Sequence, residues 1–210
     1  MSGFTIGNPS VIAQASIATA SIVTGLTLAW LAGVRVYLTV FAIGLAGALG
    51  WLALPVALHA TASAWLIGMC AVLAAIDCVA DKIPGFDSGW SLLHTLVCIP
   101  VGAFLAAATL SRDGRLDGGA LLVGGALALA SHAIKGKTRG LINASPEPLS
   151  NWSASLGEDV LTLTSLVLLL VDPWAALAVA VGGLLLGALA VLWSFRAELR
   201  APHRKTRAVA

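Results

Sequence analysis

Two polar stretches, DKIPGFDSGWS at residues 81–91 and NASPEPLSNWS at residues 143–153, each lie between long apolar runs and share one pattern. Pro, Ser, Trp and Ser occupy equivalent positions in the two copies. Four identities alone are compatible with chance, but the flanking apolar runs repeat as well, which favours an internal repeat. The repeat predicts two helix–polar turn–helix hairpins in which the turns carry the function and the apolar arms hold them in place.

The composition is that of an integral membrane protein. Hydrophobic residues make up 59% of the 210-residue chain and charged residues only 10%, proportions outside the range of soluble domains. The runs are continuously apolar and lack the alternating polarity of barrel strands, so helices are the expected spanning elements. We therefore predict an all-α, polytopic helical membrane protein with about six to seven apolar segments. Residues 1–200 form a single transmembrane domain and residues 201–210 a basic tail.

The apolar segments approach the roughly 20 residues that a bilayer span needs. They cover residues 11–33, 36–58, 64–80, 92–110, 119–133, 156–171 and 174–195. Five of the twelve basic residues gather near the C-terminus, a pattern typical of the cytoplasmic side. If each of the last five segments crosses once, the turns at 81–87 and 135–151 face the same side as the tail.

The first two segments are separated only by Val34 and Arg35, too few residues for an ordinary turn between two full spans. Two arrangements remain open, one long bent helix or a re-entrant hairpin with Arg35 at its tip. Irregular backbone inside a membrane requires protein or water around it. In the hairpin case, Arg35 points to the same side as the two polar turns.

Acidic residues at the first polar turn are candidates for binding a cation or proton. Asp77 and Asp81 are four apart, so their carboxylates share one helix face. Asp77 lies inside an apolar run and must face protein or water. For Asp81, Lys82 and Asp87, a solvated helix end is the alternative interpretation.

A basic stripe at the second polar turn is the complementary candidate. His132, Lys135, Arg139 and Asn143 are spaced three and four apart, so they share one face if the helix continues past Ala133. Such a stripe suits an anionic substrate or the carboxylates of the other hairpin. The alternative is a frayed basic helix end that reaches lipid headgroups.

Further candidates follow in the chain. Glu158 and Asp159 open the 156–171 segment, where helix capping explains one acid and leaves the other for a partner such as Lys135 or Arg139. Glu147 and Asn151 belong to the second turn, with Asn151 as a cap or ligand. His94, one turn into its segment, is either a proton carrier or a hydrogen-bonded structural residue.

Common enzyme signatures are missing from the sequence. There is no His-Glu-x-x-His motif, no Gly-x-Ser-x-Gly turn and no phosphate-cradling glycine loop. The three cysteines show no metal-ligand spacing. We expect no cofactor, assign no metal, and expect no nucleic acid partner because the basic tail is short and lacks a folded reader.

The sequence resembles the bacterial membrane family known as domain of unknown function 4126, over about residues 25–193. The motifs that carry the resemblance are Gly33-Val34-Arg35 with Tyr37 and Leu38, Ala80-Asp81-Lys82-Ile83-Pro84 with Asp87, and Ser145-Pro146-Glu147-Pro148 with Ser150-Asn151-Trp152 and Glu158-Asp159. The resemblance implies a bacterial inner membrane protein and a glutamate at the position of Asp77 in relatives. It implies no activity.

The leading hypothesis is a small membrane transporter or ion-permeation protein whose polar turns form one buried charged site. The acids bind a cation or proton, and Arg35, Lys135 and Arg139 balance charge or bind an anionic substrate. Pro84 and Pro146 fix the turns. The expected partners are the lipid bilayer and a small ion or small anionic solute, and a homo-oligomer is left open. The alternatives are a membrane enzyme or lipid-handling protein that binds a phosphorylated headgroup, and a structural membrane partner whose charges only join the hairpins.

Overall fold

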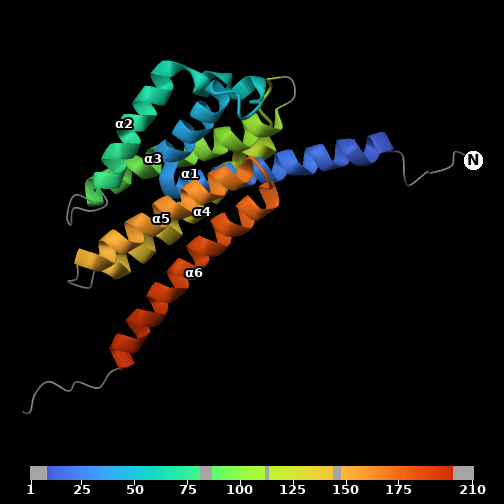
Figure 1. Cartoon of the computed structure of the whole chain (residues 1–210). Coiled ribbons are helices and arrows are strands. Elements are labelled where there is room, and N and C mark those ends of the chain that lie inside the picture. The colour runs from blue at the N-terminus through green and yellow to red at the C-terminus, as the bar shows by residue number, and fades with distance from the viewer. Residues whose placement is uncertain (1–8, 81–86, 112–113, 144–147, 201–210) are drawn as a thin grey trace, which may run out of the picture.

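The computed structural model describes the backbone of residues 9–80, 87–111, 114–143 and 148–200, and every regular element in these ranges is a helix. The elements are α1 (Pro9–Ala48), the 3₁₀ helix η1 (Val56–Ala62), α2 (Ala64–Ala80), α3 (Asp87–Leu110), α4 (Gly118–Asn143), α5 (Pro148–Leu169) and α6 (Pro173–Arg200) (Figure 1). The predicted all-α class is confirmed.

Several helices have the length and apolarity of membrane spans. Among the described residues, Ala13–Ala48, Gly118–Ile142 and Pro173–Trp193 meet both conditions, and the bent pair of η1 and α2 is a fourth candidate. Large apolar side chains point outward, such as Leu186 and Trp193 on α6. The fold is therefore that of a helical membrane protein.

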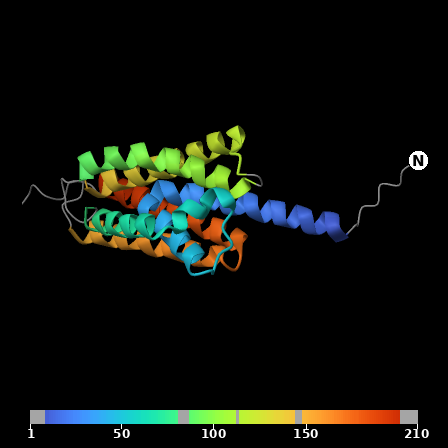
Figure 2. The same ribbon diagram turned by 90° about the horizontal axis from the view of Figure 1, so that it is seen from above.

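Helix α1 consists of two arms that meet at Arg35. Arg35 has the non-helical backbone angles φ −145° and ψ 73°, and the chain reverses direction there, so that α1 forms a V in both ribbon views (Figures 1 and 2). We call residues 9–34 the first arm and residues 36–48 the second arm. Of the two predicted arrangements, α1 has the hairpin shape, with Arg35 at its tip.

The tip of α1 lies at the centre of the bundle. Helix α1 contacts η1 and each of the other α-helices, and Arg35 itself is only 1% exposed. Helices α2 to α6 run alternately back and forth around it, with the last residues of α2, α4 and α6 on the same side of the bundle (Figures 1 and 2). This alternation agrees with the side assignment predicted for the two polar turns and the tail.

The helix boundaries follow the sequence repeat. Helix α3 begins at Asp87 and α5 at Pro148, which differ by one position in the aligned copies. However, α3 packs mainly on α1 and α4, and α5 packs mainly on α6. The arms of each hairpin are therefore joined mainly through neighbouring helices.

Close approach of α1 and α4 next to the tip depends on a glycine. A Cβ atom at Gly33 would overlap the Ser131 Oγ and the Ala128 carbonyl of α4. Glycine allows helix backbones to approach closely, as is common between membrane helices. Gly33 therefore sets the position of Arg35 relative to the basic face of α4.

Candidate functional site

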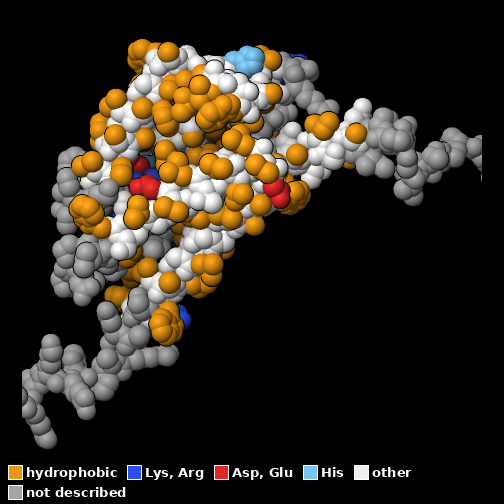
Figure 3. Space-filling view, in the orientation of Figure 1, with side chains coloured by type: hydrophobic (Ala, Val, Ile, Leu, Met, Phe, Trp, Pro, Cys, Tyr) orange, Lys and Arg blue, Asp and Glu red, His pale blue; other side chains and the backbone are white. Residues whose placement is uncertain are grey.

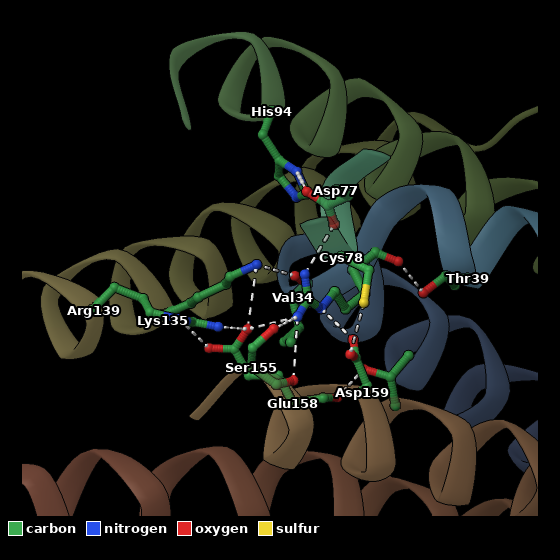
Figure 4. A network of polar contacts seen from close by, with 12 residues as sticks. Val34, Thr39, Asp77, Cys78, His94, Lys135, Arg139, Ser155, Glu158 and Asp159 are labelled. Carbon is green, nitrogen blue, oxygen red and sulfur yellow. Dashed lines mark hydrogen bonds and ion pairs between the residues drawn. The ribbon is translucent and has the colours of Figure 1, made fainter. Parts of the chain in front are cut away.

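Arg35 is held by three carboxylates from two other helices, and Figure 4 labels these carboxylates, which belong to Asp77, Glu158 and Asp159. Its Nη1 lies 3.2 Å from Asp77 Oδ2 of α2. Its Nε lies 2.8 Å from Asp159 Oδ1, and its Nη2 3.5 Å from Glu158 Oε2, both on α5. Nη2 also donates to the Ser155 hydroxyl at 3.0 Å. Because a buried guanidinium is costly unless paired, these contacts keep the charged tip inside the protein.

Two basic residues of α4 approach the same carboxylates. Arg139 binds Glu158 at two points, with Nε 3.0 Å from Oε1 and Nη2 3.1 Å from Oε2. The Lys135 ammonium lies 3.4 Å from Glu158 Oε2. Two-point pairing by a guanidinium fixes the carboxylate geometry more strongly than a single contact. Glu158 thus joins all three basic side chains.

The ion pairs form a network that we call the tip network: Arg35, Asp77, Lys135, Arg139, Glu158 and Asp159. It contains three basic groups and three carboxylates, so its formal charge is zero when all six are ionised. Neutrality is important here because charge inside a medium of low dielectric constant is expensive. Any ion that binds must therefore bring a counter-charge or displace a partner.

Side chains of α4 also satisfy the backbone at the break in α1. A helix that ends leaves carbonyl groups without N–H partners. Ser131 donates to the Trp30 carbonyl at 2.8 Å, and Lys135 donates to the Val34 carbonyl at 2.9 Å. After the break, Thr39 donates to the Arg35 carbonyl at 2.8 Å. The non-helical tip is therefore stabilised by defined contacts.

A pair of histidines adjoins the tip network. His94 Nδ1 lies 3.4 Å from Asp77 Oδ1, and the His94 ring stacks on His132 with a centroid distance of 5.3 Å and an interplanar angle of 11°. His132 Nε2 is 2.7 Å from the Thr95 hydroxyl. Tyr37 packs edge-on against His94 at 5.8 Å. The histidines thus extend the polar site from α2 to α3 and α4.

The structure brings seven of the predicted site residues into or beside one site. Six form the tip network, and His132 lies beside it. Because α4 continues past Ala133, His132, Lys135 and Arg139 of the predicted stripe lie on one helix. Lys135 and Arg139 are buried, which excludes for them the alternative of a frayed end in the headgroups.

The prediction that Glu158 and Asp159 open their helix was wrong. Helix α5 begins at Pro148, so both acids lie well inside it, and capping at its N-terminus explains neither. The segment that precedes them, residues 148–157, contains three serines and one asparagine, residue types that disfavour helix interiors, and it is helical nevertheless. Pairing with Arg35, Lys135 and Arg139 is the reason for their placement.

Several predicted residues lie outside the described part of the chain. They are Asp81, Lys82, Pro84, Pro146 and Glu147, together with the side chains of Asp87, Asn143 and Asn151. Conversely, the structure adds Ser155 and Cys78, whose thiol donates to Asp159 at 3.6 Å, to the site. Nothing in the sequence pattern marked Ser155 or Cys78 as site residues. His94 was marked, as a histidine within an apolar run, and it now contacts Asp77.

The arrangement is not that of a metal centre. Within the described ranges, no group of three or more His, Cys, Asp and Glu side chains is placed to hold a metal ion. The three carboxylates of the tip network face basic side chains instead. The site is therefore suited to ion-pair exchange, in which a bound ion competes with an existing partner.

The tip network reaches the surface between α2 and α5. One face of the molecule is mostly apolar, and acidic and basic side chains gather at one recessed place on it (Figure 3). The Asp159 side chain is 19% exposed and that of Glu158 11% exposed, against 2% for Arg35. The acidic side of the network is thus nearest to the surroundings.

A cavity of about 490 Å³ adjoins the network between α4, α5 and α6. Lys135, Ser153 and Glu158 line its polar part. Apolar residues such as Leu184 and Val191 of α6 line the rest. The lining of the cavity therefore matches an amphiphilic molecule, because charged side chains line one part of it and apolar side chains line the rest.

The fold and site define a helical membrane protein with a helical hairpin broken at Arg35 and a buried, charge-balanced network. Residues 22–194 match the family model described as domain of unknown function (DUF4126). The chain belongs to this family. Comparison with curated proteins and with solved structures finds no significant match.

Proposed function

We propose that the chain is a small membrane transporter or ion-permeation protein whose ion binds at the tip network. The observation that carries the proposal is Arg35, a buried guanidinium at a non-helical break, paired with carboxylates from two other helices. Broken helices in transporters provide binding sites inside the membrane, where irregular backbone is tolerated only around a site or cavity. Ion pairs that only join two hairpins need no such break in a helix.

The charge balance of the tip network supports a small anionic solute over a metal cation. The three carboxylates already face basic groups, and the described residues offer no metal-ligand cluster. An anion can replace one carboxylate at Arg35 or Arg139, because guanidinium groups bind carboxylate and phosphate oxygens in the same geometry.

The proposed location is a bacterial inner membrane with the C-terminus in the cytoplasm. The C-terminal ends of α2, α4 and α6 share one side of the bundle. Basic residues such as Lys137 and Arg196 lie toward these ends. Cytoplasmic loops carry an excess of Lys and Arg. Modification of single cysteines introduced at positions 115 and 137, from each side of sealed vesicles, tests this orientation.

Flux through reconstituted protein tests the proposed function. We expect Asp77→Asn to reduce proton-coupled or ion flux by at least tenfold, because it removes one charge from a balanced network. The matched control is Asp117→Asn, since Asp117 is exposed and its side chain caps α4 through the Ala120 amide, a role that asparagine also performs. Equal flux in wild type and Asp77→Asn, or no flux above empty vesicles, contradicts the proposal.

The second candidate is a lipid-handling protein or membrane enzyme that binds a phosphorylated headgroup. The cavity between α4, α5 and α6 favours it, because basic Lys135 adjoins an apolar wall. A phospholipid that co-purifies with wild type and is lost in Arg139→Ala and Gly187→Leu supports it. Gly187 lines the cavity with open space around its Cβ position. Gly68→Leu, at an exposed and equally open position on α2, is the control.

A further inference from the structure

The two stacked histidines, His94 and His132, lie beside the tip network but are not among its six residues. His94 is 3% exposed, and its Nε2 atom is buried without a hydrogen-bond partner among the described residues. Buried polar atoms are normally bonded, so an exception calls for an explanation. The other ring nitrogen faces Asp77 at 3.4 Å. A proton added to His94 would therefore place the positive charge of the ring against the Asp77 carboxylate.

The stacking limits the pair to one proton. The rings of His94 and His132 are nearly parallel, with centroids 5.3 Å apart. Two positively charged rings at this distance in a buried site repel each other, whereas one charged and one neutral ring do not. His132 is held in this stack by its Nε2 atom, which lies 2.7 Å from the Thr95 hydroxyl. The pair therefore has room for one added positive charge.

The surroundings of the pair decide what its protonation changes. The charged and titratable groups around the pair are Asp77 of α2, Arg35 and Tyr37 of α1, and Lys135 of α4. The thiols of Cys70 on α2 and Cys98 on α3 lie near Tyr37. Asp77 is the group that the histidines share with the tip network. It contacts His94 through Oδ1 and Arg35 through Oδ2.

We propose that the His94–His132 pair binds one proton and thereby prepares Arg35 to bind a small anion. The inference rests on the proposed function and names its coupling ion and substrate class. A proton on His94 strengthens the contact with Asp77 and weakens the hold of Asp77 on Arg35. The proton comes from water and returns to water, and no covalent bond forms or breaks other than the N–H bond.

The charge count favours a proton and an anion that bind together. The tip network is neutral with both histidines uncharged, so one proton makes the site positive and one monovalent anion restores neutrality. An anion without the proton would leave a net negative charge in a buried site, which is costly. The pair thus provides a physical reason for the two ions to move in the same direction.

Histidine-selective ¹⁵N spectra of the full chain in lipid nanodiscs test proton binding without any substrate. Over a pH titration, we expect His94 and His132 together to take up one proton. We also expect the Arg35 Nε signal to shift with the same midpoint. In His94→Gln, the Arg35 shift should disappear, whereas in His132→Asn, which keeps His94 beside Asp77, it should remain. Exposed His59 provides the control His59→Gln.

The outcomes separate this inference from the proposed function. Two independent protons, no proton, or an Arg35 signal that does not respond to pH overturns the inference, even if the vesicles show flux. One shared proton with the Arg35 response supports it, and the absence of any flux then counts only against transport. Circular dichroism of each variant verifies folding. A variant that does not fold is replaced by His94→Asn, and the same signals are read.

Discussion

The Lys135 ammonium donates to the Val34 carbonyl at 2.9 Å, one residue before the break in α1. The same ammonium lies 3.4 Å from Glu158 Oε2. One side chain of α4 therefore stabilises both the backbone of the hairpin tip and the ion pairs around it. A movement of α4 relative to both α1 and α5 would change both contacts together, which links the shape of the tip to the ion pairs of the network.

Replacement of Lys135 by methionine should destabilise the protein by about 3 kcal/mol or more. The change leaves the Val34 carbonyl without its side-chain donor and the network with an uncompensated negative charge, and loss of one partner from a buried pair has a cost of this size. The control is Lys137→Met on the exposed face of α4, for which we expect a change within about 0.5 kcal/mol. The free energy of unfolding in mixed micelles measures both. Equal effects of the two variants would contradict the assigned role.

Replacement of Arg35 by lysine should also fail to preserve the site, although it keeps the charge. Arg35 uses Nε, Nη1 and Nη2 toward Asp159, Asp77 and Glu158. A single ammonium cannot occupy three such positions. We expect a loss of about 3 kcal/mol, measured by the same unfolding experiment. Arg115→Lys in an exposed loop is the control, and a tolerated Arg35→Lys would show that charge alone matters at the tip.

Alanine at Gly33 should separate α1 from α4, because its Cβ would overlap the Ala128 carbonyl and the Ser131 hydroxyl. Backbone atoms cannot move aside as a flexible side chain does, so we expect a loss of about 2 kcal/mol or more. Gly136→Ala on α4 has open space around the new methyl group and should be neutral or stabilising by up to about 1 kcal/mol. Thermal unfolding of the two variants checks the contrast, and similar transition temperatures would contradict the packing argument.

Local periodicity explains which parts of the site were predictable. Lys135 and Arg139 are four residues apart, and the three- to four-residue period of a helix places them on one face in any helical fold. Likewise, Arg35 between two long apolar runs predicted either a bent helix or a hairpin tip, since no ordinary turn fits in that space. These features depend on near neighbours in the chain.

The remaining features depend on tertiary contacts. The stacking of His94 on His132 requires α3 and α4 to lie side by side, which neither residue indicates alone. The start of α5 at Pro148 was missed because a polar, serine-rich segment is a weak helix former, and pairing of its acids outweighs that preference. The network's composition and the pairing of an acid on α5 with Lys135 or Arg139 were predictable, but the pairing of Arg35 with Asp77 and Asp159 was not.

Exchange of charges between Arg139 and Glu158 distinguishes a binding site from a staple. Arg139→Glu and Glu158→Arg should each lose about 3 kcal/mol of stability, because each leaves like charges together in a buried site. The double variant should recover only part of this loss, since the new arginine would face Arg35 and Lys135. A double-mutant cycle gives the coupling between the two positions. If flux returns together with stability, the pair acts only as a staple. We expect stability to recover in part while flux does not, because ion binding requires the carboxylate and guanidinium at their present positions.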